Sequence, residues 1–300
     1  MTTVSEIQVE ADIEELSSKS SFMNVMSIML RKQPLGVFGA GIVIAMVLMA
    51  VFAEVITSID PEVNNLEYML TAPGEMFFLG TDQFGRDLLT RIIYGARTAL
   101  FVGFTCAIIG STVGLVIGVA SAYFGGMIDM IVQRIVDVIM AFPLIILALA
   151  VVATLGPGVE NVIIAITIPF IPQCARVVRS NALAIREIPY VDAARALGFN
   201  HTRIILRHMV PNVMAPFLIM LTSFLGQAIL LEASLSFLGM GVQEPTPAWG
   251  LMLQGGAEEF AESAPWVAIW PGVAISLAVF GFNLFGDSVR DVLDPKLRSQ

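Results

Sequence analysis

Six long apolar runs restrict what this 300-residue sequence can fold into. Each is nearly free of charge and has about the 20 residues that an α-helix needs to cross a bilayer. Charged residues make up only 14% of the chain, against about 25% in an ordinary soluble domain, and 56% of the residues are apolar. The sequence therefore predicts an all-α membrane protein with six transmembrane helices, at residues 35–56, 98–123, 130–154, 159–178, 213–238 and 266–285.

The positions of Lys and Arg predict how the helices are oriented. Basic residues are common in both tails and between the fourth and fifth spans, and Arg134 lies near the start of the third span, whereas the loop 240–265 contains no Lys or Arg. The stretch 57–97 holds only Arg86, Arg91 and Arg97. Because Lys and Arg near membrane spans stay preferentially on the cytoplasmic side, we expect both termini in the cytoplasm. The chain would then be a multi-pass protein of the cell inner (plasma) membrane.

Composition divides the chain into four parts. Residues 1–30 are polar and acidic and predict a flexible cytoplasmic tail, without the basic and apolar pattern of a cleaved signal peptide. Residues 31–97 hold the first span and a long extracytoplasmic loop, in which 86–100 predicts an amphipathic helix at the outer interface. Residues 98–290 form a core of five helices with a cytoplasmic loop at 180–212, and 291–300 form a C-terminal cytoplasmic tail.

Small residues and prolines predict how the spans pack. A stripe of small residues at every fourth position of the second span favours close contact with another helix: Gly110, Gly114, Gly118 and Ala122. Three prolines interrupt the third and fourth spans, at Pro143, Pro169 and Pro172. Each can kink its helix, and a kinked helix either lines a pathway or serves packing alone.

The loop between the fourth and fifth spans predicts two short helices joined by a sharp bend. Pro189 suits the first turn of a helix and Gly198 suits a C-terminal stop. Asn200 can cap a second helix, which Pro211 would end. The product is a compact basic hook, which on local rules alone is also compatible with an ordinary helical hairpin.

The sequence of this loop resembles a known motif. The run Asp192-Ala193-Ala194, followed by Gly198 and by a segment closing on Pro211, resembles the "EAA" loop of ABC importer permeases. Three positions differ from the usual pattern: Asp192 replaces Glu, His208 replaces Ile and Val210 replaces Leu. The Asp keeps the charge of the residue that it replaces.

Three further stretches narrow the resemblance to the dipeptide, oligopeptide and nickel permease subfamily. Residues 79–87, LGTDQFGRD, resemble its segment before the second span, and residues 233–250, ASLSFLGMGVQEPTPAWG, resemble its "LSFLGLGxQPPTPxWG" stretch. The C-terminal stretch 286–295, GDSVRDVLDP, also fits. The resemblance covers nearly all of the sequence from about Leu30 onward. Such importers contain two permeases, and this chain resembles the C-type one.

This resemblance implies a type I ABC importer permease fold and half of a translocation pathway for di- and oligopeptides. The implied partners are a homologous permease that completes a heterodimer, one or two ATPase subunits that hold ATP and Mg, an extracytoplasmic solute-binding protein, and membrane lipid. In the family a coupling helix in the loop docks in a cleft of the ATPase. The residues that we expect to couple this chain to it are Asp192, Ala193, Ala194, Arg195, Gly198 and Arg203.

The chain itself is not expected to be an enzyme. It contains no GxxxxGK[ST] phosphate loop, and no Ser/His/Asp set, HExxH or GxSxG motif. We therefore expect no catalytic residue, no bound cofactor or metal, and no nucleic-acid partner. Two acidic residues within predicted spans, Asp137 and Glu232, are candidates for contact with cargo in the pathway, or for pairing with a partner subunit.

Three alternatives remain open. The same machinery could import nickel, glutathione or another small solute. A secondary transporter would show an internal repeat with broken helices, and no such repeat is visible in the sequence. A membrane enzyme is disfavoured because no catalytic constellation occurs.

Overall fold

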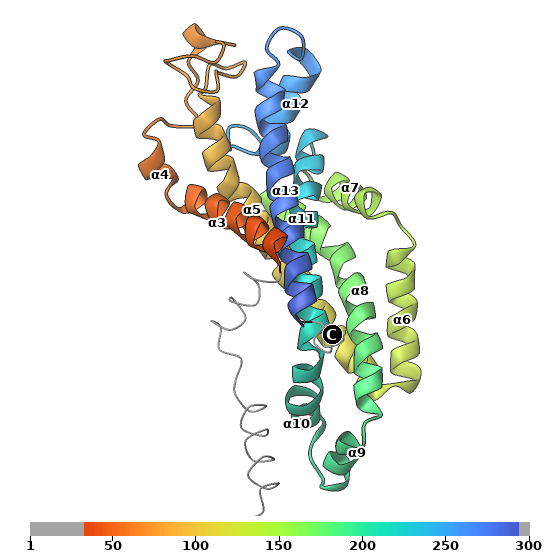
Figure 1. Ribbon diagram of the computed structural model, residues 1–300. Helices are drawn as coiled ribbons and strands as arrows, with labels where there is room; N and C mark the ends of the chain where they lie inside the picture. Colours follow the sequence, from red (N-terminus) through yellow and green to blue (C-terminus); the bar gives the residue numbers. More distant parts are fainter. Residues whose placement is uncertain (1–32, 294–300) are drawn as a thin grey trace, which may run out of the picture.

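The computed structural model describes residues 33–293, which are almost entirely helical (Figure 1). The tail predicted at 1–30 and the last residues of the tail predicted at 291–300 lie outside the described residues. The long helices are α3 (Pro34–Val51), α5 (Leu88–Phe124), α6 (Gly126–Met140), α7 (Leu144–Leu155), α8 (Val159–Arg186), α11 (Met214–Phe237), α12 (Trp249–Glu259) and α13 (Trp266–Leu293). The short elements are α4 (Ala53–Ile56), η1 (Leu66–Tyr68), α9 (Pro189–Ala196), α10 (His201–Ile204), the π-helical turn η2 (Ile205–Met209) and the 3-10 turn η3 (Val210–Val213).

The predicted number of spans agrees with the structure once a bent pair is counted as one. Four helices, α3, α5, α8 and α13, and the continuous helical stretch 201–237 are long and apolar enough to cross a membrane. The sixth is formed by α6 and α7, which meet at 88°. Pro143 was predicted to interrupt and kink the span at 130–154, and the structure confirms a break there. The break lies at Pro143, which has extended backbone (ψ 134°) and lacks the N–H that a continuing helix would use.

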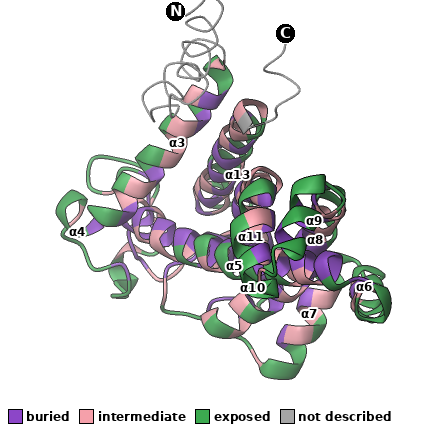
Figure 2. Ribbon diagram, turned by 90° about the horizontal axis from the view of Figure 1, so that it is seen from below, coloured by how far each residue is buried: buried purple, intermediate pink, exposed green. Residues whose placement is uncertain are grey.

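The long helix α5 is the central element of the bundle. It packs against α3, α8 and α11, and Figure 2 shows buried residues along its length while α6 is largely exposed. With 37 residues it is about 55 Å long, well beyond the roughly 30 Å of a bilayer's hydrocarbon core. Its two ends therefore reach the two opposite ends of the molecule.

The separate interfacial helix that we expected at 86–100 is absent, because these residues form the first turns of α5. The Asp87 carboxylate caps the helix by accepting the Thr90 N–H at 2.9 Å. Trp249 packs across Gly95, and its indole N–H donates to the Ile92 carbonyl at 3.0 Å. These contacts hold the apolar face of the segment against the bundle, so that it continues into the span.

The small-residue stripe of α5 is a helix contact, as its spacing predicted. It faces α8, and a Cβ added at Gly114 would lie 2.6 Å from Cys174 Cβ and 2.8 Å from the Ile171 carbonyl oxygen. Gly110 faces Phe170 equally closely. Such separations are too short for side-chain atoms, so only glycine lets the two backbones approach this closely.

The prediction for Pro211 was wrong, and the fourth span is longer than predicted. Pro211 does not end the second helix of the hook, because it lies in the first turn of η3, where its missing N–H is not required, and the chain stays helical to Phe237. The fourth span also runs past Val178 to Arg186, with Pro169 and Pro172 inside a continuous α8. Tertiary packing against α5 holds α8 together across both prolines.

Candidate functional site

The predicted hook is present at one end of the bundle, at the bottom of Figure 1. We call residues 189–209 the hook and this end the hook end. Gly198 has a φ of +75°, a backbone conformation that favours glycine, and separates α9 from α10. The Asn200 side chain accepts the Arg203 N–H at 2.8 Å and caps α10, so both the bend and the cap were predicted correctly.

The hook is held together by an apolar interior and a small polar cluster. Its buried apolar residues are Val191, Ile204 and Met209. The Tyr190 hydroxyl donates to the His208 carbonyl at 3.1 Å, and the Asn212 amide donates to the same carbonyl at 2.7 Å. The two short helices therefore form one packed unit and not a loose loop.

Most of the predicted coupling residues lie on the surface of the hook. The exposed ones are Asp192, Ala193, Arg195, Gly198 and Arg203. Ala194 is only 4% exposed, so in this structure it packs inward. Sequence reasoning missed Leu197, which is 73% exposed at the tip of the bend, although its place directly before the glycine stop was a signal.

The surface charges of the hook are loosely held. The Asp192 carboxylate, in a side chain that is 69% exposed, pairs with Arg195 at 3.0 Å. The Arg203 guanidinium lies over the Phe199 ring, 4.1 Å from its centroid. Exposed pairs of this kind contribute about 0–1 kcal/mol, so an incoming partner can replace them at little cost.

The opposite end, which we call the loop end, brings together two of the motif stretches that are far apart in sequence. Arg86 of the LGTDQFGRD stretch binds both carboxylate oxygens of Glu244, at 2.6 and 3.1 Å. Its Nε also donates to Asp82 at 2.6 Å. Arg91 lies within 3.7 Å of Asp82 and 3.5 Å of Glu244. We call these four residues the loop-end cluster.

The loop-end cluster is mostly buried and carries no net charge. Arg91 is 0% exposed, Arg86 and Asp82 are buried, and Glu244 is 40% exposed. Burial opposes the charge of Arg86, but its hydrogen bonds to Glu244 and Asp82 and their negative charges outweigh burial and raise the pKa of Arg86. The sequence analysis identified both stretches but did not predict that they contact each other. The opposite charges of Arg86 and Glu244 were the available signal.

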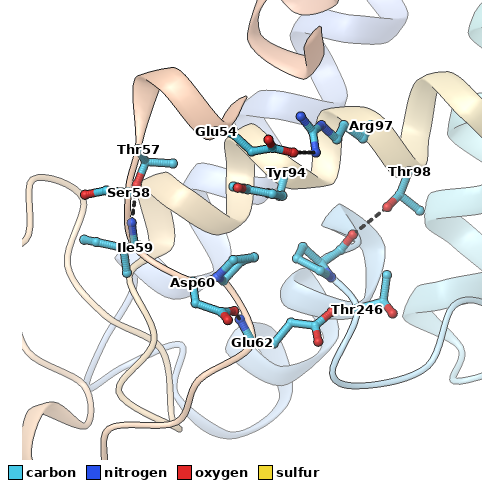
Figure 3. Close-up of a pocket in the computed structure, with 12 residues that line it drawn as sticks. Glu54, Thr57, Ser58, Ile59, Asp60, Glu62, Tyr94, Arg97, Thr98 and Thr246 are labelled. Carbon is cyan, nitrogen blue, oxygen red and sulfur yellow. Dashed lines mark hydrogen bonds and ion pairs between the residues drawn. The ribbon is translucent and has the colours of Figure 1, made fainter. Parts of the chain in front are cut away.

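An open hollow of about 620 Å³ lies at the same end, and Figure 3 shows the residues that line it. One of them, Pro61, accepts a hydrogen bond from Arg91 at 2.7 Å. Arg97 pairs with Glu54 at 3.1 Å on one side of it, and the Thr98 hydroxyl donates to the Pro247 carbonyl at 2.9 Å on another. Asp60 and Glu62 also line it. With three carboxylates and one guanidinium among its lining residues, the hollow has a negative charge.

The two pathway candidates lie in different environments. The Asp137 side chain is half exposed on α6 and pairs with Arg176 of α8. Glu232 is buried inside α11 and accepts the Ser236 hydroxyl at 2.7 Å. The structure thus gives each its own partner and does not bring the two together.

Comparison with known proteins agrees with these features. Residues 110–299 match the family described as "binding-protein-dependent transport system inner membrane component", and residues 21–73 match the N-terminal transmembrane domain of oligopeptide transport permease C. The dipeptide transport system permease protein DppC of Alkalihalophilus pseudofirmus is 44% identical over 274 residues, which cover 90% of this chain and 88% of that protein. The glutathione transport system permease protein GsiD of Escherichia coli is 40% identical over 270 residues, covering 89% and 88%.

Solved structures confirm the fold. The MetNI methionine ABC transporter, in an inward-facing conformation, matches with a TM-score of 0.54 at 22% identity, over 68% of this chain and 97% of that chain. The helical fold and the hook agree with the family match, which covers more than half of the sequence. The chain therefore belongs to the family of inner membrane components of binding-protein-dependent transport systems, and is a multi-pass permease subunit of an ABC importer.

Proposed function

We propose that this chain forms half of the transmembrane pathway for di- and oligopeptides, in a heterodimer with a homologous permease. One or two ATPase subunits hold ATP and Mg, and an extracytoplasmic binding protein delivers the peptide. The observation that carries the proposal is the hook, a packed unit that exposes its charged and small residues to a partner. The names of relatives that are 40–44% identical support peptides as the cargo.

In this proposal the hook end faces the cytoplasm, as the distribution of Lys and Arg predicts. ATP binding closes the ATPase subunits, and the hook moves with the cleft in which it docks. Asp192 exchanges its exposed pair with Arg195 for a basic residue of the ATPase. Ala193 allows close approach, and Gly198 allows the bend between the two helices. Arg195 and Arg203 contact the rim of the cleft, whereas Ala194 packs within the hook.

The decisive experiment measures labelled dialanine uptake and ATP hydrolysis by the complete importer in liposomes. Gly198→Asp places a charged side chain at a φ of +75°, where glycine is favoured, and Asp192→Lys reverses a docking charge. Both variants should insert and assemble, yet transport at least about tenfold less peptide for each ATP hydrolysed. Asp192→Lys loses a charged contact worth about 1.5–3 kcal/mol, and Gly198→Asp strains the bend that presents the hook. Normal uptake by both variants would disprove docking through the hook.

Glutathione is a second candidate cargo. It is itself a small peptide, and the GsiD relative supports it almost as well as the DppC relative supports dipeptides. Competition in the same liposomes separates the two: excess unlabelled glutathione leaves dialanine uptake unchanged if dipeptides are the cargo and abolishes it if both share the site. Competition with excess nickel tests nickel as the cargo in the same way.

A further inference from the structure

One aromatic side chain of α5 touches both helices of the hook. Tyr123, in the last turn of α5, is buried, and its hydroxyl is hydrogen-bonded to Nδ1 of His201 at 2.8 Å. The two rings meet edge to face with their centroids 5.6 Å apart. On the other side, the Arg195 guanidinium lies 5.3 Å from the centroid of the Tyr123 ring. His201 begins α10 and Arg195 lies in the last turn of α9.

Tyr123 therefore contacts the hook on both sides of its bend. Arg195 also pairs with Asp192 at 3.0 Å, so a chain of contacts leads from the exposed docking charge through Arg195 to the Tyr123 ring. A second contact ties the same end of α5 to the end of α8, because Arg186 donates to the Ala122 carbonyl at 2.9 Å. A displacement of the hook must move or break its contacts with Tyr123.

The other end of α5 explains why such a displacement would have a distant effect. The helix is continuous from Leu88 to Phe124, and its first turns carry Arg91 of the loop-end cluster and the Asp87 cap. A single helix about 55 Å long transmits movement at one end to the other without a hinge. None of the glycines within α5 has a positive φ, and they pack against α8, α11 and Trp249.

We propose that Tyr123 and His201 form the joint through which movement of the hook is transmitted to α5, and through it to the loop end. Both are positioning residues: they touch neither nucleotide nor cargo. The inference rests on the proposed function, since it needs a hook that is driven by an ATPase. It adds a specific route to that function, from the docking face through Arg195 and Tyr123 to the central helix.

The test uses the complete importer in liposomes and measures labelled dialanine uptake and ATP hydrolysis in the same vesicles. Tyr123→Ala should keep ATP hydrolysis and subunit content within about twofold of wild type, yet transport about tenfold less peptide per ATP. Tyr123→Phe, which loses only the hydrogen bond, should lose about two- to tenfold. His201→Asn should stay within about twofold, because its amide places a donor and an acceptor near the position of Nδ1.

Tyr190→Phe is the matched control. It removes a hydroxyl that bonds His208 and Asn212 and does not reach α5, so its peptide-to-ATP ratio should fall less than that of Tyr123→Phe. The proposal of a joint would be overturned if Tyr123→Ala kept the wild-type ratio of peptide transported to ATP hydrolysed. A parallel loss of hydrolysis, uptake and assembled complex would overturn it as well, since that pattern marks a purely structural contact.

Gly198→Asp in the same series separates the two proposals. If Gly198→Asp uncouples the importer and Tyr123→Ala does not, only the joint is wrong. If Gly198→Asp and Asp192→Lys both couple normally, docking through the hook fails, and the joint fails with it.

Discussion

The two ends of α5 use charged residues in opposite ways. At the loop end, Arg86, Arg91 and Asp82 are buried: Arg86 is hydrogen-bonded to Asp82 and Glu244, and Arg91 lies within 3.7 Å of the same two carboxylates. At the hook end, Asp192 and Arg195 form an exposed pair with little to hold it. Buried charges are costly to separate, whereas exposed pairs exchange partners readily. The difference indicates a fixed end, which holds the helix in place, and an exchangeable end, which is free to bind a partner.

The largest expected effect comes from removing a buried charge of the fixed end. Asp82→Asn leaves Arg86 and Arg91 with Glu244 as their remaining carboxylate in the cluster. Removing one partner of a buried ion pair typically costs about 3–5 kcal/mol, so the free energy of unfolding should fall by about that amount. Denaturant unfolding of the detergent-purified protein measures it.

Glu54→Gln is the control for that measurement. It breaks an ion pair with Arg97 that lies on the same side of the molecule but is exposed. Its cost should be under about 1 kcal/mol. If Asp82→Asn and Glu54→Gln lowered the free energy of unfolding equally, the buried ion pairs of the loop end would contribute no more than an exposed pair.

An intermediate effect is expected at Glu244, which is the exposed member of the loop-end cluster. Glu244→Gln weakens the bidentate contact with Arg86. Because water reaches part of the site, we expect the free energy of unfolding to fall by about 1–2 kcal/mol. The double variant with Arg86→Met should lose less than the sum of the two single variants. Additive losses would mean that the two residues do not act as a pair.

The smallest effect on stability is expected at the hook. Asp192→Asn removes only an exposed pair, so the free energy of unfolding should change by less than about 1 kcal/mol. Uptake of dialanine per folded importer should nevertheless fall about two- to tenfold, because the docking contact is lost. The comparison between the two ends breaks down if Asp192→Asn destabilises the protein as much as Asp82→Asn does.

Local features of the chain could be predicted because neighbouring residues specify them. Pro189, Gly198 and Asn200 set the start, the bend and the cap of the hook through the conformations and hydrogen bonds of their own turns. The spacing of Gly110 and Gly114 placed them on one face of a helix, and that face meets α8. Each of these inferences uses residues that lie within a few positions of one another.

Where distant contacts compete with local signals, the sequence-based expectations failed. Pro211 looked like a helix end, yet the chain passes through it into α11. Residues 86–100 looked like an interfacial helix, yet Trp249 packs on them and draws them into the bundle. Neither partner could be identified from the local pattern, since Trp249 follows Ile92 by 157 positions.

The sequence by itself determined that the chain is an all-α membrane protein with about six spans and a bent hook, because apolar length and turn chemistry are local properties. The tertiary structure alone decided which charges are buried and which are free. Arg86 and Glu244 are 158 positions apart, and only the folded bundle brings them within 2.6 Å and excludes water from the guanidinium. The same packing places Tyr123 of α5 against His201, so that a helix end and a distant bend become one contact.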